Sequence, residues 1–369
     1  MTDPVLWSLD DHTRAKHRVL RKYLDGWIPI MGQQALKVPL GRQPALLLVD
    51  GFAGPGRYAG GEPGSPLIML DALTSHAALP RISGVVFHFL FIEHDERRFD
   101  HLQTEVARLI LPSNVVLHVR HGEFETTFDT IVDGITSNGK QLIPTFAFID
   151  PFGYTSASMS LTGRFLEFQR SEALFFLPLS FIHRFVRRDG QEAALTGLFN
   201  TEDWRQAIPL EGADRREYLV DLFERQLASQ GQVQHTRSFQ LRTMDGNDYR
   251  LVFATDHAKG LEVMKQAMWT VDPVEGTGYV AQTDTGQQVL FQPEVDTGPL
   301  LEELRQAFDG RWFSVSDAYN VTLLRTPFLQ SHLKTKTLKP AEKAGLIDVD
   351  RSDGSRAGAY GNGVRIRFI

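Results

Sequence analysis

The sequence predicts an α/β protein with a Rossmann-like, mostly parallel sheet, followed by a smaller winged-helix-like module. Three observations predict this fold. Apolar runs alternate with helical patterns through the first half of the chain, several runs end on an acid followed by Gly, Pro or His, and residues 299–369 carry three helical and two strand patterns. The composition, 42% hydrophobic and 23% charged over 369 residues, is that of a globular protein with a large core.

The first 44 residues are predicted to form a basic helix that packs on the core. Asp10 or Asp11 is a suitable N-cap. Apolar residues then recur at helical spacing, at Val19, Leu20, Tyr23, Leu24 and Trp27. The remaining helical surface is basic, with Arg14, Lys16, Arg18, Arg21 and Lys22.

Residues 45–270 are predicted to form the Rossmann-like domain. Continuous apolar runs are typical of strands buried on both faces of a parallel sheet, and they occur at 45–49, 85–92, 115–119, 145–149 and 173–178. Helical patterns at 97–111 and 124–135 separate some of these runs, which gives a βαβ alternation. A further helix is expected at 218–227, and a hairpin at 232–242 and 248–255.

The C-terminal part of the chain is predicted to be a separate module. Residues 271–298 are rich in Gly, Thr, Asp and Gln, which indicates a linker or loop. Residues 299–369 then contain helices at 301–308, 315–323 and 327–344 and strands at 346–349 and 364–368. Three helices and a two-stranded wing describe a winged-helix-like domain.

Charge is unevenly distributed along the chain. The net charge is −6, but residues 321–369 hold nine Lys and Arg against four acids and are therefore +5, which leaves −11 for the rest. This favours a phosphate-facing surface and a nucleic-acid partner, with contacts from Lys334, Lys336, Lys339, Arg351 and Arg356. The alternative on charge alone is a solvated basic face without a partner.

Several classes of chemistry are excluded or disfavoured. The chain has no cysteine, which excludes disulfides, thiolate metal sites and a cysteine nucleophile. The histidines have no metal-ligand spacing, so no metal is expected; no Gly-x-Ser-x-Gly elbow occurs, and no Walker lysine follows the first glycine loop. Neither a signal peptide nor an apolar run of membrane-spanning length is recognised, so we expect a cytoplasmic protein without membrane association.

The strongest candidate site is the glycine loop after the first predicted strand. It comprises Asp50, Gly51, Phe52, Ala53 and Gly54, followed by Pro55 and Gly56. Glycine lets the backbone approach a ligand closely, and Glu93, at the end of the next strand, is placed to accept hydrogen bonds from the ribose of an adenosine cofactor. Ser65 is predicted to be an N-cap before Pro66, so a helix N-terminus there suits the carboxylate of a methionine moiety. The alternatives are a tight turn and a cap that only stabilises its helix.

Two further loops follow later strands. The Gly122–Glu123 turn, with Phe124, is positioned to meet an adenine ring and its amino group. Asp150, Pro151 and Phe152, followed by Gly153, form the candidate catalytic loop: an aspartate accepts a hydrogen bond from an exocyclic amine while an aromatic ring stacks on a base. An ordinary turn is the alternative for both loops.

These motifs together resemble the three-Cys-motif partner family of bacterial proteins, over almost the whole chain. The resemblance rests on Trp7, Lys16-His17, Tyr23, the segment 49–58, Gly64-Ser65-Pro66, Phe91-Ile92-Glu93, Ile149 to Gly153, Ala254-Thr255, and Gly260 through Met264-Lys265 to Met268-Trp269. It implies, as a partner, a protein that carries the cysteines this chain lacks.

The order of motifs is also similar to the bacterial ribosomal RNA large-subunit methyltransferase J family, which methylates adenine N6 with S-adenosylmethionine. This similarity implies cofactor contacts from Lys16, His17, Ser65, Glu93, Gly122 and Glu123, and a catalytic role for Asp150. Two departures are visible: Phe52 replaces a histidine, and Asp150-Pro151-Phe152-Gly153 replaces an Asp-Pro-Pro-aromatic loop. Adenine N6 is therefore only one candidate acceptor.

The sequence thus predicts the Rossmann-like fold of class I methyltransferases, with S-adenosylmethionine as cofactor and S-adenosylhomocysteine as product. The expected substrate is a nucleic acid, with Asp150 in the catalytic loop. The alternative is a methyltransferase-like protein, inactive or only cofactor-binding, that docks a three-Cys-motif partner. Oligomeric state is not predicted.

Overall fold

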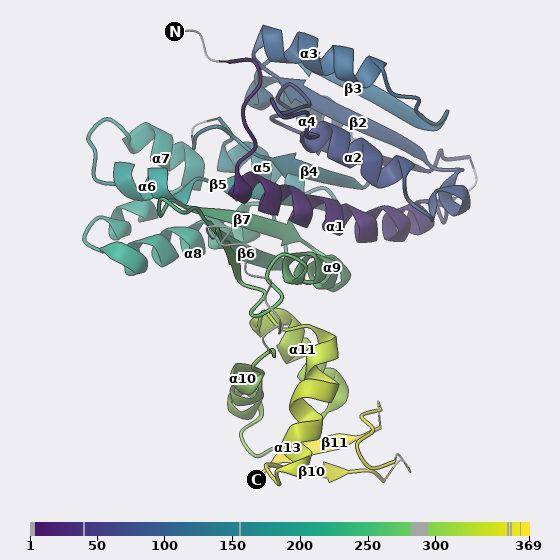
Figure 1. Ribbon diagram of the computed structural model, residues 1–369, viewed down its shortest axis with the longest axis vertical. Coiled ribbons are helices and arrows are strands. Elements are labelled where there is room, and N and C mark those ends of the chain that lie inside the picture. The colour runs from purple at the N-terminus through teal and green to yellow at the C-terminus, as the bar shows by residue number, and fades with distance from the viewer. Residues whose placement is uncertain are drawn as a thin grey trace. The chain divides into compact units, whose positions relative to one another are not determined.

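The computed structural model describes residues 4–39, 41–154, 156–281, 294–352, 354, 356–361 and 363–369. The chain forms two compact units (Figure 1). One comprises Met1–Val263 and Tyr279–Thr283, and the other Met264–Gly278 and Asp284–Ile369. Part of the expected linker, residues 282–293, lies outside the described residues.

The first unit is built on an eight-stranded sheet with the order β3-β2-β1-β4-β5-β7-β6-β8. Strands β1 to β5 are parallel, whereas β7 pairs antiparallel with both β5 and β6. The strands are β1 (Ala45–Asp50), β2 (Val86–Glu93), β3 (Val115–His121), β4 (Thr145–Ile149), β5 (Ser171–Leu177), β6 (His235–Arg242), β7 (Asp248–Thr255) and β8 (Gly278–Val280). This order, reversing between β1 and β4 and ending in an antiparallel hairpin, is that of the class I methyltransferase fold. The predicted Rossmann-like α/β fold is confirmed.

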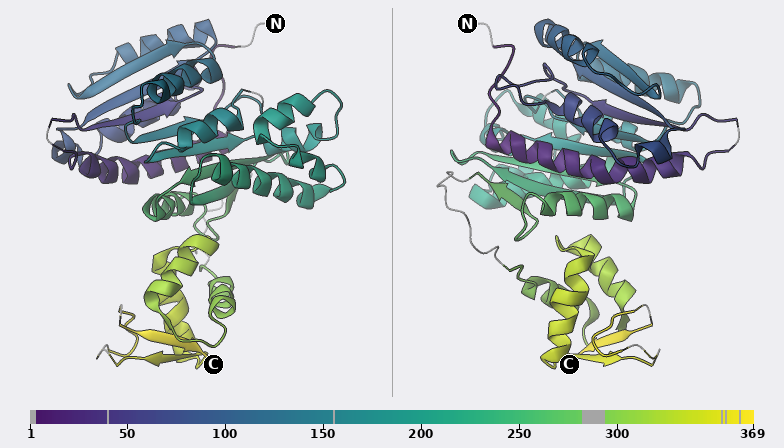
Figure 2. Two further views of the ribbon diagram at one scale, coloured as in Figure 1. Left: turned by 180° about the vertical axis from the view of Figure 1, so that it is seen from behind. Right: turned by 45° about the vertical axis from the view of Figure 1, so that its right-hand side comes forward.

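Helices cover both faces of this sheet (Figures 1 and 2). Helices α1 (Asp11–Ala35), α2 (Ser65–Thr74) and α3 (Glu96–Ala107) lie on one face. The other face carries α4 (Phe124–Ser137), α5 (Met159–Leu166), α7 (Glu192–Phe199) and α8 (Gly212–Gln230), whose apolar side chains form one core cluster with those of the strands. The unit also contains α6 (Leu179–Phe185) and the 3-10 turns Leu79–Ile82 and Asp203–Ala207. Right-handed crossovers between parallel strands require this two-sided arrangement.

A buried carboxylate fixes α1 to the sheet. Glu172 at the start of β5 accepts hydrogen bonds from Tyr23 Oη at 2.7 Å and Trp27 Nε1 at 2.5 Å, both on α1. Thr255 at the end of β7 donates to the other carboxylate oxygen. Burial raises the pKa of Glu172, and the three donors oppose that rise. Asp10 is the N-cap residue of α1, but its side chain accepts no capping hydrogen bond.

The junction between the units departs from the expected boundaries. The strand β8 lies within the segment 271–298 that the sequence indicates as linker or loop. Helix α9 (Ala258–Trp269) ends in the second unit, although residues 264–270 are expected to belong to the first domain. The reason is packing: Lys265 Nζ donates to the carbonyls of Thr322 and Leu323, and Trp269 Nε1 donates to the carbonyl of Pro327 at 2.8 Å.

The second unit contains helices and a small sheet around its own apolar core. The elements are α10 (Gly298–Phe308), β9 (Phe313–Ser314), α11 (Val315–Arg325), α12 (Gln330–His332), a π-helical segment (Leu333–Leu338), α13 (Lys339–Lys343), β10 (Ile347–Asp350) and β11 (Arg365–Phe368). Strands pair in the order β10-β11-β9, so the short β9 adds a third strand to the expected pair. α12, the π-helical segment and α13 run on without a break as one helix, residues 330–343.

Candidate active site

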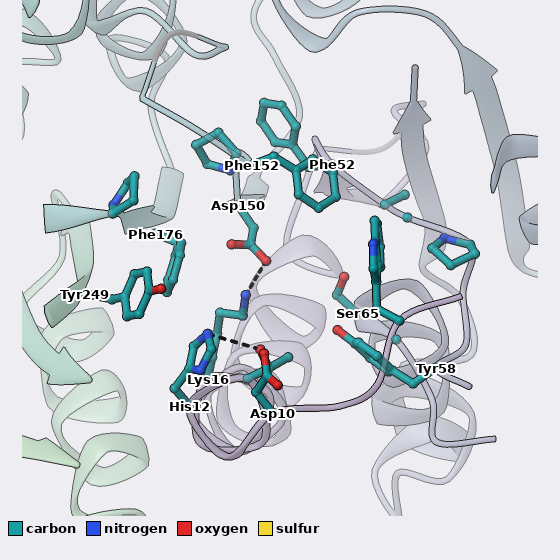
Figure 3. Close-up of a pocket in the computed structure, with 18 of the residues that line it drawn as sticks. Asp10, His12, Lys16, Phe52, Tyr58, Ser65, Asp150, Phe152, Phe176 and Tyr249 are labelled. Carbon is teal, nitrogen blue, oxygen red and sulfur yellow. Dashed lines mark hydrogen bonds and ion pairs between the residues drawn. The ribbon is translucent and has the colours of Figure 1, made fainter. Parts of the chain in front are cut away.

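A cavity of about 460 Å³ opens at the carboxyl ends of β1, β4 and β5 in the first unit. Its wall combines the N-terminal segment, the start of α1, the loop after β1, the loop after β4, and the facing ends of β5 and β7 (Figure 3). Of the predicted site residues, it is lined by Lys16, Phe52, Ala53, Gly54, Ser65, Asp150, Pro151 and Phe152. Ligands of open α/β sheets bind at this edge, where the strand order reverses.

The glycine loop turns away from β1 into this cavity. Gly54 and Gly56 have φ angles of 63° and 84°, which side chains with a Cβ rarely adopt. Gly51 is required for a different reason, because a Cβ there would lie 2.6 Å from the Phe124 ring. Gly54 and Gly56 therefore shape the cavity wall, and Gly51 lets the loop pack on α4.

Glu93 holds the glycine loop from behind and does not line the cavity. Its side chain is 1% exposed, and its two carboxylate oxygens accept the backbone N–H groups of Gly54 and Asp95, each at 2.8 Å. Each carboxylate oxygen can accept a second hydrogen bond. The strand-end position predicted for this acid is observed, but its hydrogen-bond donors here are backbone N–H groups, and His94 Nδ1 lies 3.4 Å from its Oε1.

Asp50 is a fully buried carboxylate beside the cavity. Its Oδ1 accepts the N–H of Phe52 at 3.3 Å, while its Oδ2 has no hydrogen-bond partner. Burial raises the pKa of Asp50 to about 7, and a hydrogen bond from Ser65 and the charge of Lys16 oppose that rise. The expected N-cap role of Ser65 is wrong: Gly64 is the N-cap residue, and Ser65 is the first residue of the helix.

Asp150 is paired with Lys16 at the centre of the cavity. Lys16 Nζ lies 2.5 Å from Asp150 Oδ2, and the two side chains are 7% and 19% exposed. Figure 3 shows them pointing toward one another, with Ser65 and Tyr58 on one side and Phe176 and Tyr249 on the other. The Lys16 ammonium also lies 4.3 Å from the centre of the Phe176 ring. The pair thus stands at the border of two halves of the cavity.

One half of the cavity has an aromatic wall that the sequence did not identify. His12, Tyr249 and Phe176 form a stacked row, with ring centres 4.8 Å apart for the first pair and 5.1 Å for the second. They come from α1, β7 and β5, three segments far apart in the chain. No local motif marks such residues, because only the sheet order brings them together.

A second aromatic group joins the N-terminal segment to the catalytic loop. The ring of Trp7 lies 5.0 Å from that of Phe152, and the Arg98 guanidinium lies 4.0 Å from the Trp7 ring. Trp7 also approaches the Cα of Gly54 closely enough that a Cβ there would be 3.6 Å from it. Phe152 nevertheless remains 59% exposed. The predicted residues of the catalytic loop therefore do line the cavity, and Trp7 of the N-terminal segment packs against Phe152.

Three other predicted contacts lie away from the cavity wall. His17 is 7% exposed and packs beside Tyr58; burial, and then the charge of Lys16, lower its pKa to about 3. Gly122 and Glu123 precede α4, where Glu123 is the exposed N-cap residue. None of the three lines the cavity.

The predicted basic contacts of the second unit divide into two kinds. Arg351 is held by Glu342 through two hydrogen bonds of 2.6 and 2.7 Å, and Tyr360 donates to the same carboxylate at 2.6 Å. Lys336, Lys339 and Arg356 are exposed, and Lys334 is half-buried. The structure thus leaves the lysines open to solvent and places Arg351 in an internal pair.

The part of the chain that the structure describes contains neither a metal-site arrangement nor a membrane-spanning helix. No cluster of three or more His, Asp or Glu side chains among its residues is arranged to hold a metal ion. Within the same residues, no helix has the length and apolar character needed to span a bilayer.

Comparison with known proteins finds likeness in structure only. No family model and no curated protein matches the sequence. Among solved structures, a candidate O-methyltransferase from Klebsiella pneumoniae is 12% identical, with 69% of this chain and 91% of that chain covered and a TM-score of 0.31. The O-methyltransferase TomG from Streptomyces achromogenes, solved in complex with S-adenosylmethionine, is 15% identical over 68% of this chain and 92% of that one, with a TM-score of 0.29. A methyltransferase from Methanosarcina mazei is 9% identical over 57% and 92%, with a TM-score of 0.28. Because these scores are low, the fold assignment rests on the strand order and its antiparallel end.

Proposed function

We propose that the protein is an S-adenosylmethionine-dependent methyltransferase whose acceptor is a nitrogen atom of a nucleic acid. The observation that carries this proposal is the cavity at the strand-order reversal, whose wall brings together the glycine loop, Ser65 and the Asp150–Lys16 pair, with the partnerless Asp50 oxygen buried behind that wall.

The hydrogen-bonding groups at and behind the cavity wall fit the methionine part of the cofactor. Asp50 Oδ2 is a buried acceptor without a partner, which is costly unless a donor reaches it, and an ammonium group supplies such a donor. The neighbouring N-terminus of α2, at Ser65, offers unpaired backbone N–H groups that suit a carboxylate. Ammonium and carboxylate are the two charged groups of the methionine moiety.

Glu93 and the glycine loop would hold the ribose side of the cofactor. Glu93 Oε2 accepts only the Gly54 N–H and can accept a second hydrogen bond, so the carboxylate retains capacity for a hydroxyl donor, whereas Oε1 already faces the Asp95 N–H and His94 Nδ1. The positive-φ glycines keep side chains out of the path. Bound cofactor supplies an electrophilic methyl group on a sulfonium sulfur.

Asp150 and Lys16 would carry the acceptor chemistry. Asp150 Oδ2 accepts a hydrogen bond from an acceptor N–H once Lys16 shifts, which aligns the nitrogen lone pair with the methyl group. Asp150 would then take the proton that the acceptor nitrogen loses on methylation, or pass it to solvent. The stacked row of His12, Tyr249 and Phe176 suits a flat ring as the group that bears this nitrogen.

The nucleic-acid part of the proposal is supported by the second unit. Its order of three helices and a small sheet resembles winged-helix modules, which bind phosphates and bases. Lys334, Lys336 and Lys339 lie together on its third helix.

Calorimetric titration of S-adenosylmethionine and S-adenosylhomocysteine into the full chain tests the cofactor step. We expect micromolar binding by the wild type and at least tenfold weaker binding of both ligands by Asp50→Asn, which keeps the shape and removes the charge. Lys140→Gln, at an exposed lysine away from the cavity, serves as the control. No heat with either ligand would overturn the proposal.

The second candidate function is a docking protein that keeps the fold without methyl transfer. The Asp150–Lys16 pair favours it, because the proposed catalytic carboxylate already has a cationic partner. Incubation with S-adenosylmethionine labelled in its methyl group, together with total DNA and RNA, separates the two. Label in nucleic acid supports the enzyme; cofactor binding without transfer, combined with a stable complex with a three-Cys-motif protein, supports docking.

A further inference from the structure

The third helix of the second unit, residues 330–343, has one buried and one exposed face. His332, Leu333, Thr337, Leu338 and Ala341 are buried against the core of that unit. The opposite face, exposed or half-exposed, carries Gln330, Ser331, Lys334, Thr335, Lys336, Lys339 and Lys343. Every member of this set, hereafter the helix face, is a hydrogen-bond donor or a cation.

The π-helical segment Leu333–Leu338 widens this face. In an α-helix, residues five apart point in different directions, whereas a π-turn brings them to the same side. Leu333 and Leu338 are both buried, and Thr337 Oγ1 donates to the carbonyl of His332, five residues back. Three consecutive residues, 334 to 336, can therefore face outward. Such π-insertions are frequent at functional sites.

The helix face has no counter-charge in the described part of the chain. None of its four lysines lies within ion-pair distance of a described carboxylate. The one acid of the helix, Glu342, is occupied by Arg351 and Tyr360. Four lysines on one helix, uncompensated within a chain of net charge −6, form a local site for a polyanion.

The first turns of the helix have the chemistry that reads base edges. Gln330 can pair with adenine N6 and N7, Lys334 with guanine O6 and N7, and Ser331 and Thr335 with either. Lys336, Lys339 and Lys343 follow toward the C-terminal end, where phosphates of a groove wall are met. A recognition helix has this order: residues that contact base edges lie in its first turns, and cations that contact phosphates follow them.

We propose that the second unit recognises duplex DNA by inserting the helix face into the major groove. An α-helix enters the wide major groove of B-form DNA, whereas the major groove of A-form RNA is too narrow for side chains to read. This inference rests on the proposed function in taking a nucleic acid as partner, and it deepens it by naming the substrate class. The helix carries the contacts, and Arg351 of the adjoining hairpin does not, because it is held by Glu342.

Fluorescence anisotropy with a labelled duplex of about 20 base pairs, measured over a range of salt concentrations, tests the charge contacts. We expect the triple variant Lys336→Gln, Lys339→Gln and Lys343→Gln to bind at least tenfold more weakly, with a salt slope smaller by about three. The matched control is Lys22→Gln, Lys37→Gln and Lys140→Gln, three exposed lysines of the first unit. Equal loss in both triple variants would overturn the proposal, and so would unchanged binding in the first.

Two further readouts test the groove and the bases. An RNA duplex of the same sequence is expected to bind at least tenfold more weakly than DNA, and equal or tighter binding of RNA would overturn the choice of DNA. Selection from a pool of duplexes with a randomised centre is expected to enrich one sequence motif when the wild type is used. With Gln330→Ala, we expect the base preference within that motif to be weaker. A pool without enrichment would overturn base reading.

Failure of this inference is separable from failure of the proposed function. DNA binding by the helix face needs no cofactor, so it survives a protein that binds no S-adenosylmethionine. Conversely, the protein could bind S-adenosylmethionine while the lysine variant keeps the wild-type affinity for both DNA and RNA. That result would leave the methyltransferase proposal standing and overturn this one.

Discussion

The charged groups around the cavity of the first unit and those on the third helix of the second unit are organised in opposite ways. Around the cavity, carboxylates are held in place: the buried Glu93 by two backbone N–H groups, and the half-buried Asp150 by Lys16. On the helix face, Lys336, Lys339 and Lys343 point into solvent without an ion pair among the described residues.

The difference matches the two tasks that we propose. A catalytic group must be held at one position, because a small displacement of a reacting atom lowers the rate strongly. A phosphate contact needs a positive charge on a side chain long enough to reach the phosphate. A flexible, exposed lysine supplies both, and it stays solvated until the nucleic acid binds. Fixed charges are therefore expected to affect chemistry and stability, and free charges to affect salt-dependent binding.

The largest expected effect is on methyl transfer. Asp150→Asn keeps the shape of the catalytic loop and removes the carboxylate, so we expect the rate to fall by a factor of about 10² to 10⁴. Single-turnover transfer of a labelled methyl group measures it, with calorimetry showing that S-adenosylmethionine still binds. Transfer within twofold of wild type would remove Asp150 from the chemistry.

The next largest effect concerns the buried anchor of α1. Glu172→Ala would leave the donors of Tyr23, Trp27 and Thr255 unpaired, and we expect the free energy of unfolding to fall by about 3 kcal/mol. Chemical denaturation measures this change. Glu172→Gln is the matched control, because its amide oxygen can accept from Trp27 and Tyr23 while its NH₂ donates to a rotated Thr255 hydroxyl, so most of the stability should remain. An equal loss in both variants would point to the charge.

A third prediction uses the raised pKa of Asp50, about 7. A cationic ligand group binds the ionised carboxylate, so binding releases a proton and affinity rises with pH through that pKa. Between pH 6 and pH 8 we expect about a tenfold gain in affinity for S-adenosylmethionine, which calorimetry at several pH values measures. Asp50→Asn should abolish the dependence; a profile that stays steep in the variant would assign it elsewhere.

The same carboxyl makes a stability prediction of known sign. Its pKa in the folded state lies above its ordinary value, so the folded protein binds the proton more tightly than the unfolded chain does. The stabilising contribution is therefore present at low pH and is lost as pH rises toward about 7. Urea midpoints of wild type and Asp50→Asn, compared at pH 5 and pH 8, should converge at low pH and diverge at high pH in favour of the variant.

The sequence predicted the strands well because buried parallel strands are continuous apolar runs. Ala45–Asp50 and Thr145–Ile149 are found almost as expected, and an acid follows or closes each. The direction in which the acids at the strand ends point was not predictable from the sequence. Glu93 turns to the backbone of the glycine loop while Asp150 faces the cavity, and the choice depends on contacts with residues far away in the sequence.

The missed parts of the site are non-local. Phe176 and Tyr249 meet because β5 and β7 are neighbours in the sheet, and Trp7 covers the loop from the N-terminal segment. Composition predicted Arg351 as a phosphate contact, but its ion pair with Glu342 depends on the hairpin folding back on α13. Charge in a sequence therefore locates a basic surface and does not show which cations are free.

The smallest expected effect makes that last distinction measurable. Arg351→Ala should lower the free energy of unfolding by about 1 kcal/mol, because it removes a two-bond, partly buried ion pair and leaves Glu342 with Tyr360 alone. Its affinity for duplex DNA and its salt slope should match wild type, in contrast to Lys336→Gln, which should leave stability unchanged and reduce the slope by about one. Denaturation and anisotropy on the same two variants measure both quantities. If Arg351→Ala weakens DNA binding as much as Lys336→Gln does, its pair with Glu342 opens on binding, and the division into fixed and free charges fails at this residue.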